Sequence, residues 1–387
     1  MKKYNIETLC VHNGQNITDD HAFGAISVPI YQSATFAHPG IGQTTGYYYT
    51  RESNPTRTEL EEIVNTLEHA YDTVATSSGM AALSIVLELF GEGDHFVCSE
   101  DLYGGSVRIF DTIGVERGRE FSYVDTTDLA VVEASIKENT KAIYIETPSN
   151  PTMQVSDLVA VSEIAKKHGA LLIVDNTFLS PYFQNPIDLG ADIVVHSGTK
   201  YLGGHNDTLS GFLSVNTKEL AEKVRLLYKT IGMQLSPFDS YLMIRGIKTL
   251  AVRMERQQEN AMKIAQWLKQ NDRVEKVYYV GLPEHPGYEI NKKQARGFGA
   301  MLTFELTKEE YAINILEKVR MIKYAESLGG VETLITYPMT QTHADVPEHI
   351  RKQNGITDCV LRMSVGIENV KDLLNELEEV FAEVRGE

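Results

Sequence analysis

The stretch Ile193-Val194-Val195-His196-Ser197-Gly198-Thr199-Lys200 joins a short apolar run to two hydroxyl side chains and a lysine. The apolar run is typical of a buried strand. In a parallel sheet, Lys200 would lie at the carboxyl end of this strand, where such sheets form a crevice. An amine there can form a Schiff base with an aldehyde cofactor, and the hydroxyls of Ser197 and Thr199 can donate hydrogen bonds to a phosphate. Taken alone, the stretch also fits a solvated loop lysine, which is the more common case.

Two earlier apolar runs, at 141–145 and 171–174, also end in polar residues. The first leads into Glu146-Thr147-Pro148-Ser149-Asn150 and the second into Asp175, with a helical pattern between them. The spacing fits successive βαβ units, whose crossovers keep the strands parallel, and continuous apolar strands imply helices on both faces. We therefore predict an α/β fold in which one sheet edge gathers polar side chains: Asn150, Asp175, Ser197, Thr199 and Lys200.

The whole chain is expected to have three parts. Residues 1–52 combine scattered Gly and Pro with several aromatics, so we expect an N-terminal arm that contacts a neighbouring subunit. Residues 53–251 would form the α/β domain, and residues 252–387 a smaller α+β domain. Within the α/β domain, Ser77-Ser78-Gly79 precede an Ala- and Leu-rich run, which is typical of a helix start whose free N–H groups suit a phosphate. Simple helix capping would produce the same pattern.

Composition argues against several functional classes. The chain has 387 residues and a formal net charge of −17, which disfavours nucleic acid or an anionic membrane as a partner. Its three cysteines, Cys10, Cys98 and Cys359, have neither disulfide nor zinc spacing, and no HExxH pattern occurs, so we expect no metal. The start lacks the apolar core of a signal peptide, and no apolar run approaches the length of a membrane span. A cytoplasmic location is the expectation.

Two further residues are candidates for chemistry. Asp175 would lie between the strands that deliver Asn150 and Lys200, where it could pair with the ring nitrogen of a pyridine cofactor and favour its protonated form. Capping a turn is the more usual role of an aspartate at a strand end. Tyr103 precedes Gly104 and Gly105, which would let its ring lie flat against another ring. A core tyrosine with a satisfied hydroxyl is the alternative.

Seven stretches, in order along nearly the whole chain, resemble those of the Cys/Met metabolism (transsulfuration) family of pyridoxal-phosphate (PLP) enzymes, of the cystathionine γ-synthase and γ-lyase type. They are Tyr49-Thr50-Arg51 with Asn54-Pro55-Thr56-Arg57, Ser77-Ser78-Gly79-Met80-Ala81-Ala82, Asp101-Leu102-Tyr103-Gly104-Gly105, Glu146-Thr147-Pro148-Ser149-Asn150-Pro151, Val174-Asp175-Asn176-Thr177, the Lys200 stretch, and Ala325-Glu326-Ser327-Leu328-Gly329-Gly330. The resemblance implies the fold type I of PLP-dependent transferases, with a mostly parallel seven-stranded sheet covered by helices. It also implies pyridoxal 5'-phosphate as the cofactor.

The resemblance assigns roles to these residues. Three residues would be catalytic: Lys200 would bind the cofactor covalently and then act as a base at the substrate Cα, and Asp175 would bind the pyridine nitrogen. Tyr103 would stack on the ring and assist proton transfers. The phosphate would be held by residues of two subunits: Gly79, Met80, Ser197 and Thr199 of one, with Tyr49 and Arg51 of its neighbour. The substrate would be bound by Arg362, Asn150, Ser327 and Glu326. For Arg362, the alternative is a solvated strand face.

The reaction type depends on finer resemblances. Gly40-Ile41-Gly42, Gly204-His205-Asn206-Asp207, Pro237-Phe238-Asp239-Ser240 and the stretch 336–343 resemble bacterial enzymes of the cystathionine γ-synthase and O-acetylhomoserine thiol-lyase type. These act at the γ-carbon of homoserine-derived amino acids in methionine and cysteine metabolism. Gly105 occupies the position where methionine γ-lyases typically carry cysteine, which argues against methionine γ-lyase activity. The alternative is a cystathionine γ- or β-lyase that releases a keto acid, ammonia and a thiol. The family implies a homotetramer, a dimer of active dimers.

Several smaller expectations complete the prediction. A nucleotide-binding oxidoreductase is disfavoured because no GxGxxG follows a first strand. A cofactor-free binding or scaffold protein remains a rival that colourless protein would support. Gly198 replaces a more common alanine, which should only loosen packing slightly, and His343 is expected near the entrance of the site or on the surface.

Overall fold

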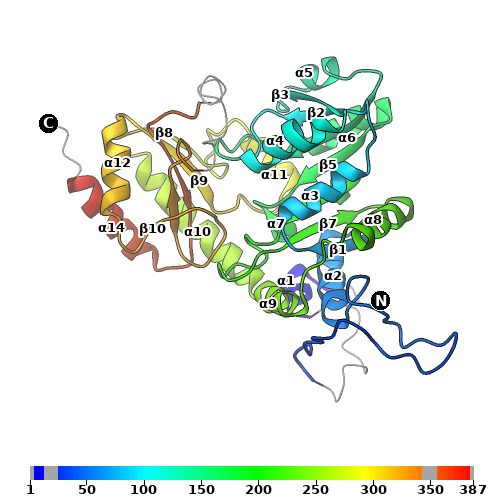
Figure 1. Cartoon of the computed structure of the whole chain (residues 1–387). Coiled ribbons are helices and arrows are strands. Elements are labelled where there is room, and N and C mark those ends of the chain that lie inside the picture. The colour runs from blue at the N-terminus through cyan, green and yellow to red at the C-terminus, as the bar shows by residue number, and fades with distance from the viewer. Residues whose placement is uncertain (1–3, 13–24, 342–354, 384–387) are drawn as a thin grey trace.

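The computed structural model describes residues 4–12, 25–341 and 355–383. Two sheets organise the chain, and each carries its own helices (Figure 1). The strands up to Val215 form a seven-stranded sheet, and the strands from Val274 onward form a five-stranded sheet. Helix α10 (Leu250–Leu268) packs against elements of both parts, including α7 and β9.

The large sheet has the strand order β1-β7-β6-β5-β4-β2-β3. Neighbouring strands from β3 to β6 are parallel, whereas β7 is antiparallel to both β6 and β1. The strands are β1 (Asp72–Thr76), β2 (His95–Ser99), β3 (Glu120–Val124), β4 (Thr140–Glu146), β5 (Leu171–Asp175), β6 (Ile193–Ser197) and β7 (Gly211–Val215). The predicted α/β fold with a mostly parallel seven-stranded sheet is confirmed.

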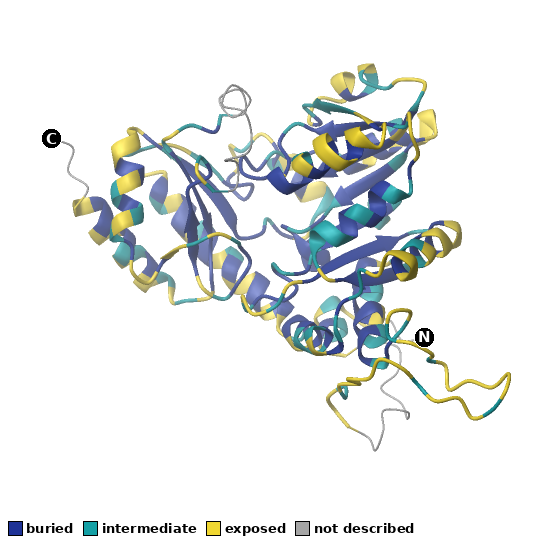
Figure 2. Cartoon of the chain, viewed as in Figure 1, coloured by how far each residue is buried: buried dark blue, intermediate teal, exposed yellow. Residues whose placement is uncertain are grey.

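Helices cover both faces of the large sheet because its strands are apolar on both sides. Ile173 of β5 belongs to one apolar cluster, whereas Leu172 and Val174 of the same strand belong to another. The helices of this part are α2 (Pro55–Glu68), α3 (Gly79–Glu88), α4 (Gly104–Ile109), α5 (Leu129–Ala134), α6 (Leu158–His168), α7 (Ser180–Phe183), α8 (Lys218–Ile231) and α9 (Pro237–Ile247), with the π-helix η2 (Phe110–Gly114) and the 3-10 helix η3 (Pro186–Leu189). Figure 2 shows buried strands beneath helices whose outer faces are exposed.

Local sequence signals set the ends of the helices that lead to the cavity. Ser78 caps α3, since its Oγ accepts a hydrogen bond from Ala81 N at 3.1 Å. Asp157 caps α6 by accepting from Ala160 N at 3.0 Å, and Gly169 ends that helix in the left-handed region at φ +68°. The start of α3 lies where the sequence predicts it, and α6 fills the helical pattern predicted between the two strands.

The small sheet has the strand order β10-β11-β12-β9-β8. Its strands are β8 (Val274–Tyr278), β9 (Met301–Leu306), β10 (Lys323–Tyr324), β11 (Leu334–Thr336) and β12 (Val360–Ser364), and its helices are α11 (Tyr288–Gln294), α12 (Glu309–Lys318) and α14 (Val370–Glu383). Strand β12 is antiparallel to both β11 and β9, and all five of its residues are buried. Arg362, at its centre, is therefore not on a solvated face. Within the described ranges, no helix has both the length and the apolar character to cross a membrane.

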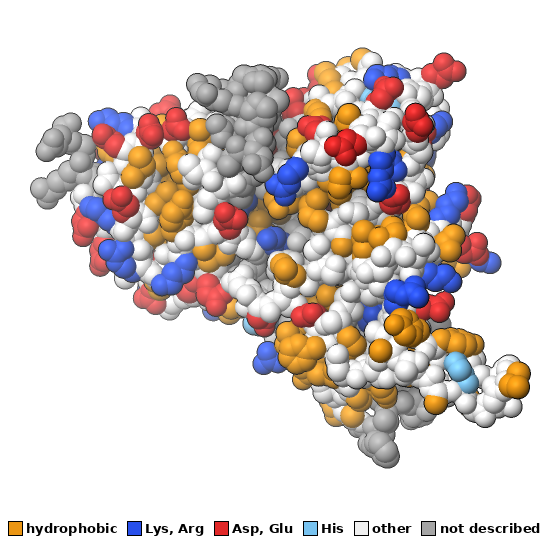
Figure 3. All heavy atoms as spheres, viewed as in Figure 1, with side chains coloured by type: hydrophobic (Ala, Val, Ile, Leu, Met, Phe, Trp, Pro, Cys, Tyr) orange, Lys and Arg blue, Asp and Glu red, His pale blue; other side chains and the backbone are white. Residues whose placement is uncertain are grey.

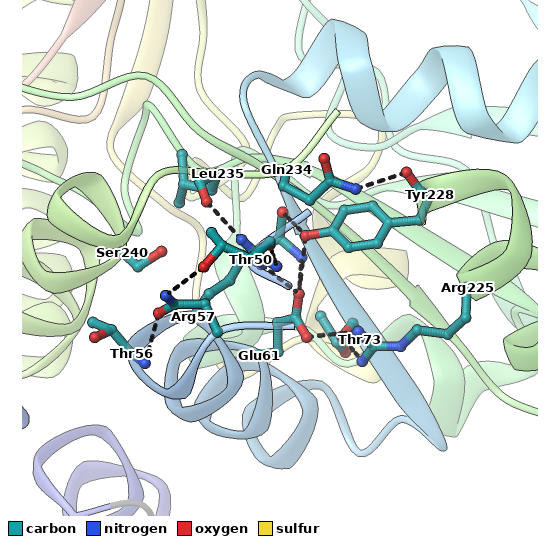
Figure 4. Close-up of polar contacts among 12 residues, drawn as sticks. Thr50, Thr56, Arg57, Glu61, Thr73, Arg225, Tyr228, Gln234, Leu235 and Ser240 are labelled. Atoms are coloured by element: carbon teal, nitrogen blue, oxygen red, sulfur yellow. Dashed lines mark hydrogen bonds and ion pairs between the residues drawn. The ribbon is translucent and has the colours of Figure 1, made fainter. Parts of the chain in front are cut away.

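Residues 25–53 precede the large sheet as a mostly exposed segment, which Figure 1 shows extending away from it. A buried charge cluster fixes the end of this segment (Figure 4). Arg57 donates from Nη2 to Thr50 O at 2.5 Å and from Nη1 to Leu235 O at 3.1 Å. Glu61 accepts from Ala75 N of β1 at 3.0 Å and pairs with Arg225 Nη1 at 2.7 Å. The segment is thus anchored where it enters α2, and Pro29 and Tyr31 of the segment also bond Thr56 at the start of that helix.

Candidate active site

A cavity of about 400 Å³ lies at the carboxyl ends of β4, β5 and β6, and the small sheet supplies its other wall. Figure 3 shows the surface hollowed between the two parts of the molecule. The cavity gathers eleven of the thirteen predicted site residues, namely Gly79, Met80, Tyr103, Asn150, Asp175, Ser197, Thr199, Lys200, Glu326, Ser327 and Arg362. Five of them, Asn150, Asp175, Ser197, Thr199 and Lys200, are the residues that the sequence places at the carboxyl edge of parallel strands.

Lys200 follows β6 in a tight turn in which its backbone N–H donates to Ser197 O at 3.2 Å. Its Nζ donates to Ser327 Oγ at 2.8 Å, across the cavity. Burial, together with the like charge of Arg362, lowers the pKa of Lys200 from 10.5 to about 8, and Glu326 opposes this shift. The amine is consequently neutral in far more molecules near neutral pH than an exposed lysine, as a nucleophile or base requires.

Two carboxyl groups stand side by side where β4 and β5 end at the cavity. Glu146 ends β4 and Asp175 ends β5, and the two residues are partners in the strand register. Burial raises the pKa of Asp175, although Thr177, whose N–H donates to Asp175 Oδ1 at 3.0 Å, opposes the shift. Burial and the neighbouring Asp175 raise the pKa of Glu146 well above its ordinary value. A cationic group bound in the cavity would be stabilised by this pair.

The start of α3 meets the end of β6 at the cavity. A Cβ on Gly79 would lie 3.0 Å from the Ser197 Cα. The two backbones therefore lie so close together that they leave almost no room for a side chain at position 79. Ser197 N donates to Thr177 Oγ1 at 2.9 Å, and Thr199 Oγ1 donates to Ser210 O at 3.2 Å. The first-turn N–H groups of this ten-residue helix, with the Ser197 hydroxyl, form a set of donors suited to a phosphate, whereas the Thr199 hydroxyl already donates to Ser210 O.

Tyr103 lies at the start of α4 and is 42% exposed, so its ring borders the cavity rather than the core. Its backbone N–H donates to Glu146 Oε2 at 2.9 Å. A Cβ on Gly105 would lie 2.3 Å from the ring of Tyr103, so any side chain at position 105 would displace that ring. The position of the Tyr103 ring at the cavity therefore depends on glycine at position 105.

Arg362 projects from the centre of β12 and is 2% exposed. Its Nη1 donates to Asn150 Oδ1 at 2.9 Å, and its Nη2 donates to Ser327 O at 3.1 Å and to Thr336 Oγ1 at 3.3 Å. Its buried Nε has no partner within the described part of the chain. Burial lowers the pKa of Arg362 to about 10, yet the group stays cationic at neutral pH. A fixed guanidinium of this kind suits a carboxylate.

Tyr49 and Arg51 are the two predicted residues that do not line the cavity of their own chain. Both are exposed, and the Arg51 guanidinium lies 5.5 Å from the centre of the Tyr49 ring. Arg51 Nη1 donates to Lys229 O at 2.5 Å. Their predicted contact with a neighbouring subunit stays a prediction.

The structure corrects one expectation and adds residues that the sequence did not single out. A Cβ on Gly198 would lie 2.4 Å from Ser210 Oγ and 2.5 Å from the Phe212 ring. The space beside Gly198 is therefore already occupied, and glycine does not loosen the packing as expected. Thr177, Thr336 and the buried Glu146 hold the predicted residues in place. All three lie within quoted stretches, but the contact of Thr336 with Arg362 is made within the small sheet and was not predicted. His343 lies outside the described residues.

The lining fits pyridoxal phosphate. An amine of lowered pKa, a buried acid pair, an aromatic face and a helix N-terminus surround one cavity, and these match an aldehyde, a pyridine nitrogen, a ring and a phosphate. Within residues 4–12, 25–341 and 355–383, no group of three or more His, Cys, Asp or Glu side chains could hold a metal ion.

Comparison with known proteins agrees with this geometry. The family model described as Cys/Met metabolism PLP-dependent enzyme matches residues 7–382. A cystathionine β-lyase of Lactococcus lactis is 49% identical over 97% of this chain and 98% of its own length. A cystathionine γ-synthase of Haemophilus influenzae is 46% identical over 99% of this chain and 100% of its own. The crystal structure of a cystathionine γ-lyase from Lactobacillus plantarum, complexed with L-serine, is 46% identical, with a TM-score of 0.95 over 98% of this chain and 99% of that one. The chain thus belongs to the Cys/Met metabolism family of PLP-dependent enzymes.

Proposed function

We propose that this enzyme carries out replacement at the γ-carbon of homoserine-derived amino acids, as a cystathionine γ-synthase or O-acetylhomoserine thiol-lyase does. The observation that carries the proposal is a pair of opposite charges on the small-sheet wall. Arg362 is buried at the inner end, whereas Glu326 is exposed yet still lines the cavity. The guanidinium suits the α-carboxylate of the first amino acid, and the outer carboxylate suits the ammonium group of an incoming amino-acid thiol such as cysteine.

The chain's own residues have separate tasks in this proposal. Asp175 would hold the ring nitrogen of the cofactor, Tyr103 its ring face, and Gly79, Met80, Ser197 and Thr199 its phosphate. Pyridoxal phosphate, when bound, supplies an electron-withdrawing ring that stabilises negative charge at the substrate Cα. Arg362, with Asn150 and Ser327 around it, orients the substrate carboxylate so that the Cα–H bond faces Lys200.

Lys200 would remove the Cα proton. A base is most effective when its pKa is near the working pH, and burial gives this amine a pKa of about 8. Ser327 Oγ, which accepts from Lys200 Nζ at 2.8 Å, fixes the direction of the amine. Once a leaving group has departed from Cγ, addition of a thiol completes replacement, and addition of water leads to a keto acid and ammonia.

A lyase is the second candidate. The relatives at 46–49% identity include both a cystathionine β-lyase and a cystathionine γ-synthase, so the same scaffold supports either outcome. Elimination needs the same base at Cα and the same carboxylate clamp. Replacement and γ-elimination differ in whether a thiol or water reaches the cavity after the first half of the reaction, whereas β-elimination breaks the bond at Cβ instead of Cγ.

Product identification separates the two candidates. Holoenzyme is given cystathionine alone and, separately, O-acetylhomoserine or O-succinylhomoserine with cysteine. Replacement predicts cystathionine in the second assay with little keto acid in the first, and the reverse outcome contradicts it. Glu326→Gln should raise the KM for cysteine more than the KM for the acylhomoserine. Glu332→Gln is the matched control, since Glu332 bonds Asn206 Nδ2 outside this cavity.

We further propose the assembly and the domain division. Residues 1–52 act as an arm that brings Tyr49 and Arg51 to the phosphate site of a neighbouring subunit in a cytoplasmic homotetramer, with residues 53–251 and 252–387 as the two domains. The exposure of most of residues 25–52 supports this proposal, whereas helix α1 (Ile6–Val11) packs against α2 and α10 of its own chain with Cys10 buried. If Arg51 acts on the neighbour, Lys200→Ala and Arg51→Ala chains, each poorly active alone, should regain activity when refolded together. Absence of such complementation would contradict a shared site.

A further inference from the structure

Two loops at the cavity are joined by buried carboxylates. The first loop, residues 100–103, follows β2, and the second, residues 147–157, follows β4. Asp101 of the first loop is 2% exposed, and its Oδ2 accepts from Ser149 Oγ at 2.5 Å, from Thr152 N at 3.3 Å and from the Thr152 hydroxyl. Three donors on one carboxylate oxygen hold the second loop at both ends of Asn150-Pro151.

A second link runs in the opposite direction. Glu146, from which the second loop starts, accepts from the backbone N–H of Tyr103 in the first loop at 2.9 Å. Each loop therefore contributes one carboxylate that binds the other loop. Tyr103 and Asn150 both line the cavity, whereas Asp101 does not. Asp101 can influence a bound substrate only through the residues that it holds.

Asn150, which lies between the two residues that Asp101 binds, is one of the acceptors of the Arg362 guanidinium. Asn150 Oδ1 accepts from Arg362 Nη1 at 2.9 Å, and Arg362 comes from the small sheet, far away in sequence. Hydrogen bonds thus join Asp101 to Ser149 and Thr152, the backbone joins these residues to Asn150, and Asn150 binds the guanidinium. A displacement of Asn150 would turn the guanidinium, because Nη2 is anchored separately on Ser327 O and Thr336 Oγ1.

We propose that Asp101 is a positioning residue, which fixes Asn150 and thereby aims the Arg362 guanidinium at the α-carboxylate of the amino-acid substrate. The inference rests on the proposed role of Arg362 as the carboxylate site. It does not depend on whether the enzyme performs replacement or elimination, because both begin with the same bound amino acid.

The test uses holoenzyme and glycine, the smallest probe that carries an α-carboxylate. Thr152→Val removes one hydroxyl donor to Asp101 at nearly constant shape, and Thr152→Ser is the matched control that keeps it. Binding is followed by the change in cofactor absorbance as glycine is added. We expect Thr152→Val to weaken glycine binding several-fold and Asp101→Asn roughly 10-fold, since small displacements of a clamp are costly, whereas Thr152→Ser binds like the unmodified enzyme. Cofactor content and the absorbance without glycine should stay unchanged in all three.

Two outcomes would overturn the inference. If Thr152→Val and Asp101→Asn lower the thermal unfolding midpoint but leave glycine binding unchanged, the contacts stabilise the fold only. If cofactor content falls in parallel with glycine binding, Asp101 supports the whole cavity and not Arg362. Arg362→Lys, tested alongside, separates this failure from failure of the proposed function. Unchanged glycine binding in Arg362→Lys refutes the carboxylate site itself, whatever Asp101 does.

Discussion

The two walls of the cavity are built by different rules. The large-sheet wall consists of residues that follow parallel strands, where topology alone collects Glu146, Asp175 and Lys200 at one edge. The small-sheet wall takes Arg362 from the middle of an antiparallel strand, where its side chain is held by three acceptors from distant segments. We infer that the first wall retains the cofactor and the second selects the substrate, so that damage to each should give a different signature.

The largest effect is expected from Lys200→Ala on the cofactor wall. Loss of the amine removes both the covalent anchor and the base, so kcat should fall by at least about 10³-fold. Borohydride reduction followed by peptide mapping should label Lys200 in the unmodified enzyme and nothing in the variant. A labelled peptide elsewhere, or full activity in colourless protein, would break the assignment of this wall.

Asp175→Asn tests the same wall without removing the anchor. The substitution keeps the size of the side chain but removes the negative charge proposed to pair with the ring nitrogen, so kcat should fall roughly 10²-fold. The absorption spectrum of the bound cofactor should change even before substrate is added. An unchanged spectrum together with an increased KM would show that Asp175 acts on the substrate and not on the cofactor.

Arg362→Lys tests the substrate wall. A lysine ammonium keeps the charge but cannot bond Asn150, Ser327 and Thr336 in the planar geometry of a guanidinium, so kcat/KM should fall roughly 30-fold, mainly through KM. Cofactor affinity and absorbance should match those of the unmodified enzyme. A fall in cofactor affinity would show that the two walls cannot be separated as proposed.

The smallest effect concerns pH and links the walls. Capture of pyridoxal phosphate by cofactor-free protein needs neutral Lys200, whose pKa is about 8, so the rate should rise about tenfold from pH 7 to a plateau above pH 8. Because Arg362 contributes to this lowered pKa, Arg362→Gln should move the midpoint to higher pH, whereas Arg362→Lys should not. Stopped-flow absorbance gives both midpoints, and identical values for Gln and Lys would contradict the coupling.

The same amine affects folding stability with a defined sign. The folded pKa of Lys200, about 8, is below its ordinary value of 10.5, so the unfolded chain binds more protons between these two values. The free energy of unfolding should therefore gain a contribution that rises with pH across this window. Below about pH 8 the cost of burying the charge is fully present. Lys200→Met should abolish this contribution in denaturant titrations of the cofactor-free protein.

Sequence reasoning predicted the two walls unequally. Ser78 and Gly79, Asp175 and Lys200 each follow or precede a local pattern, a helix cap or a strand end, and the parallel topology brings such positions together. Arg362 carried no local signal beyond the alternation of its strand, and its assignment came from family resemblance. Asp101 and Glu146 lie in the quoted motifs, but the sequence assigned them no role. Their carboxylates act through contacts between two loops, and residue spacing does not reveal such contacts. For Gly198, the packing of Ser210 and Phe212 decided what the sequence could not.

The amino-acid sequence by itself determined the alternation of strands and helices between residues 141 and 200, the helix start at Ser78, and the residue types available to a PLP site. These follow from periodicity and from local hydrogen bonds, which act over a few residues. Only the tertiary structure decided that Arg362 contacts Asn150 and that Lys200 contacts Ser327. It also decided that Asp101 binds the loop that carries Asn150. Such contacts join segments distant in the chain, and burial alone gives their charges and hydrogen bonds the strength on which the proposed chemistry depends.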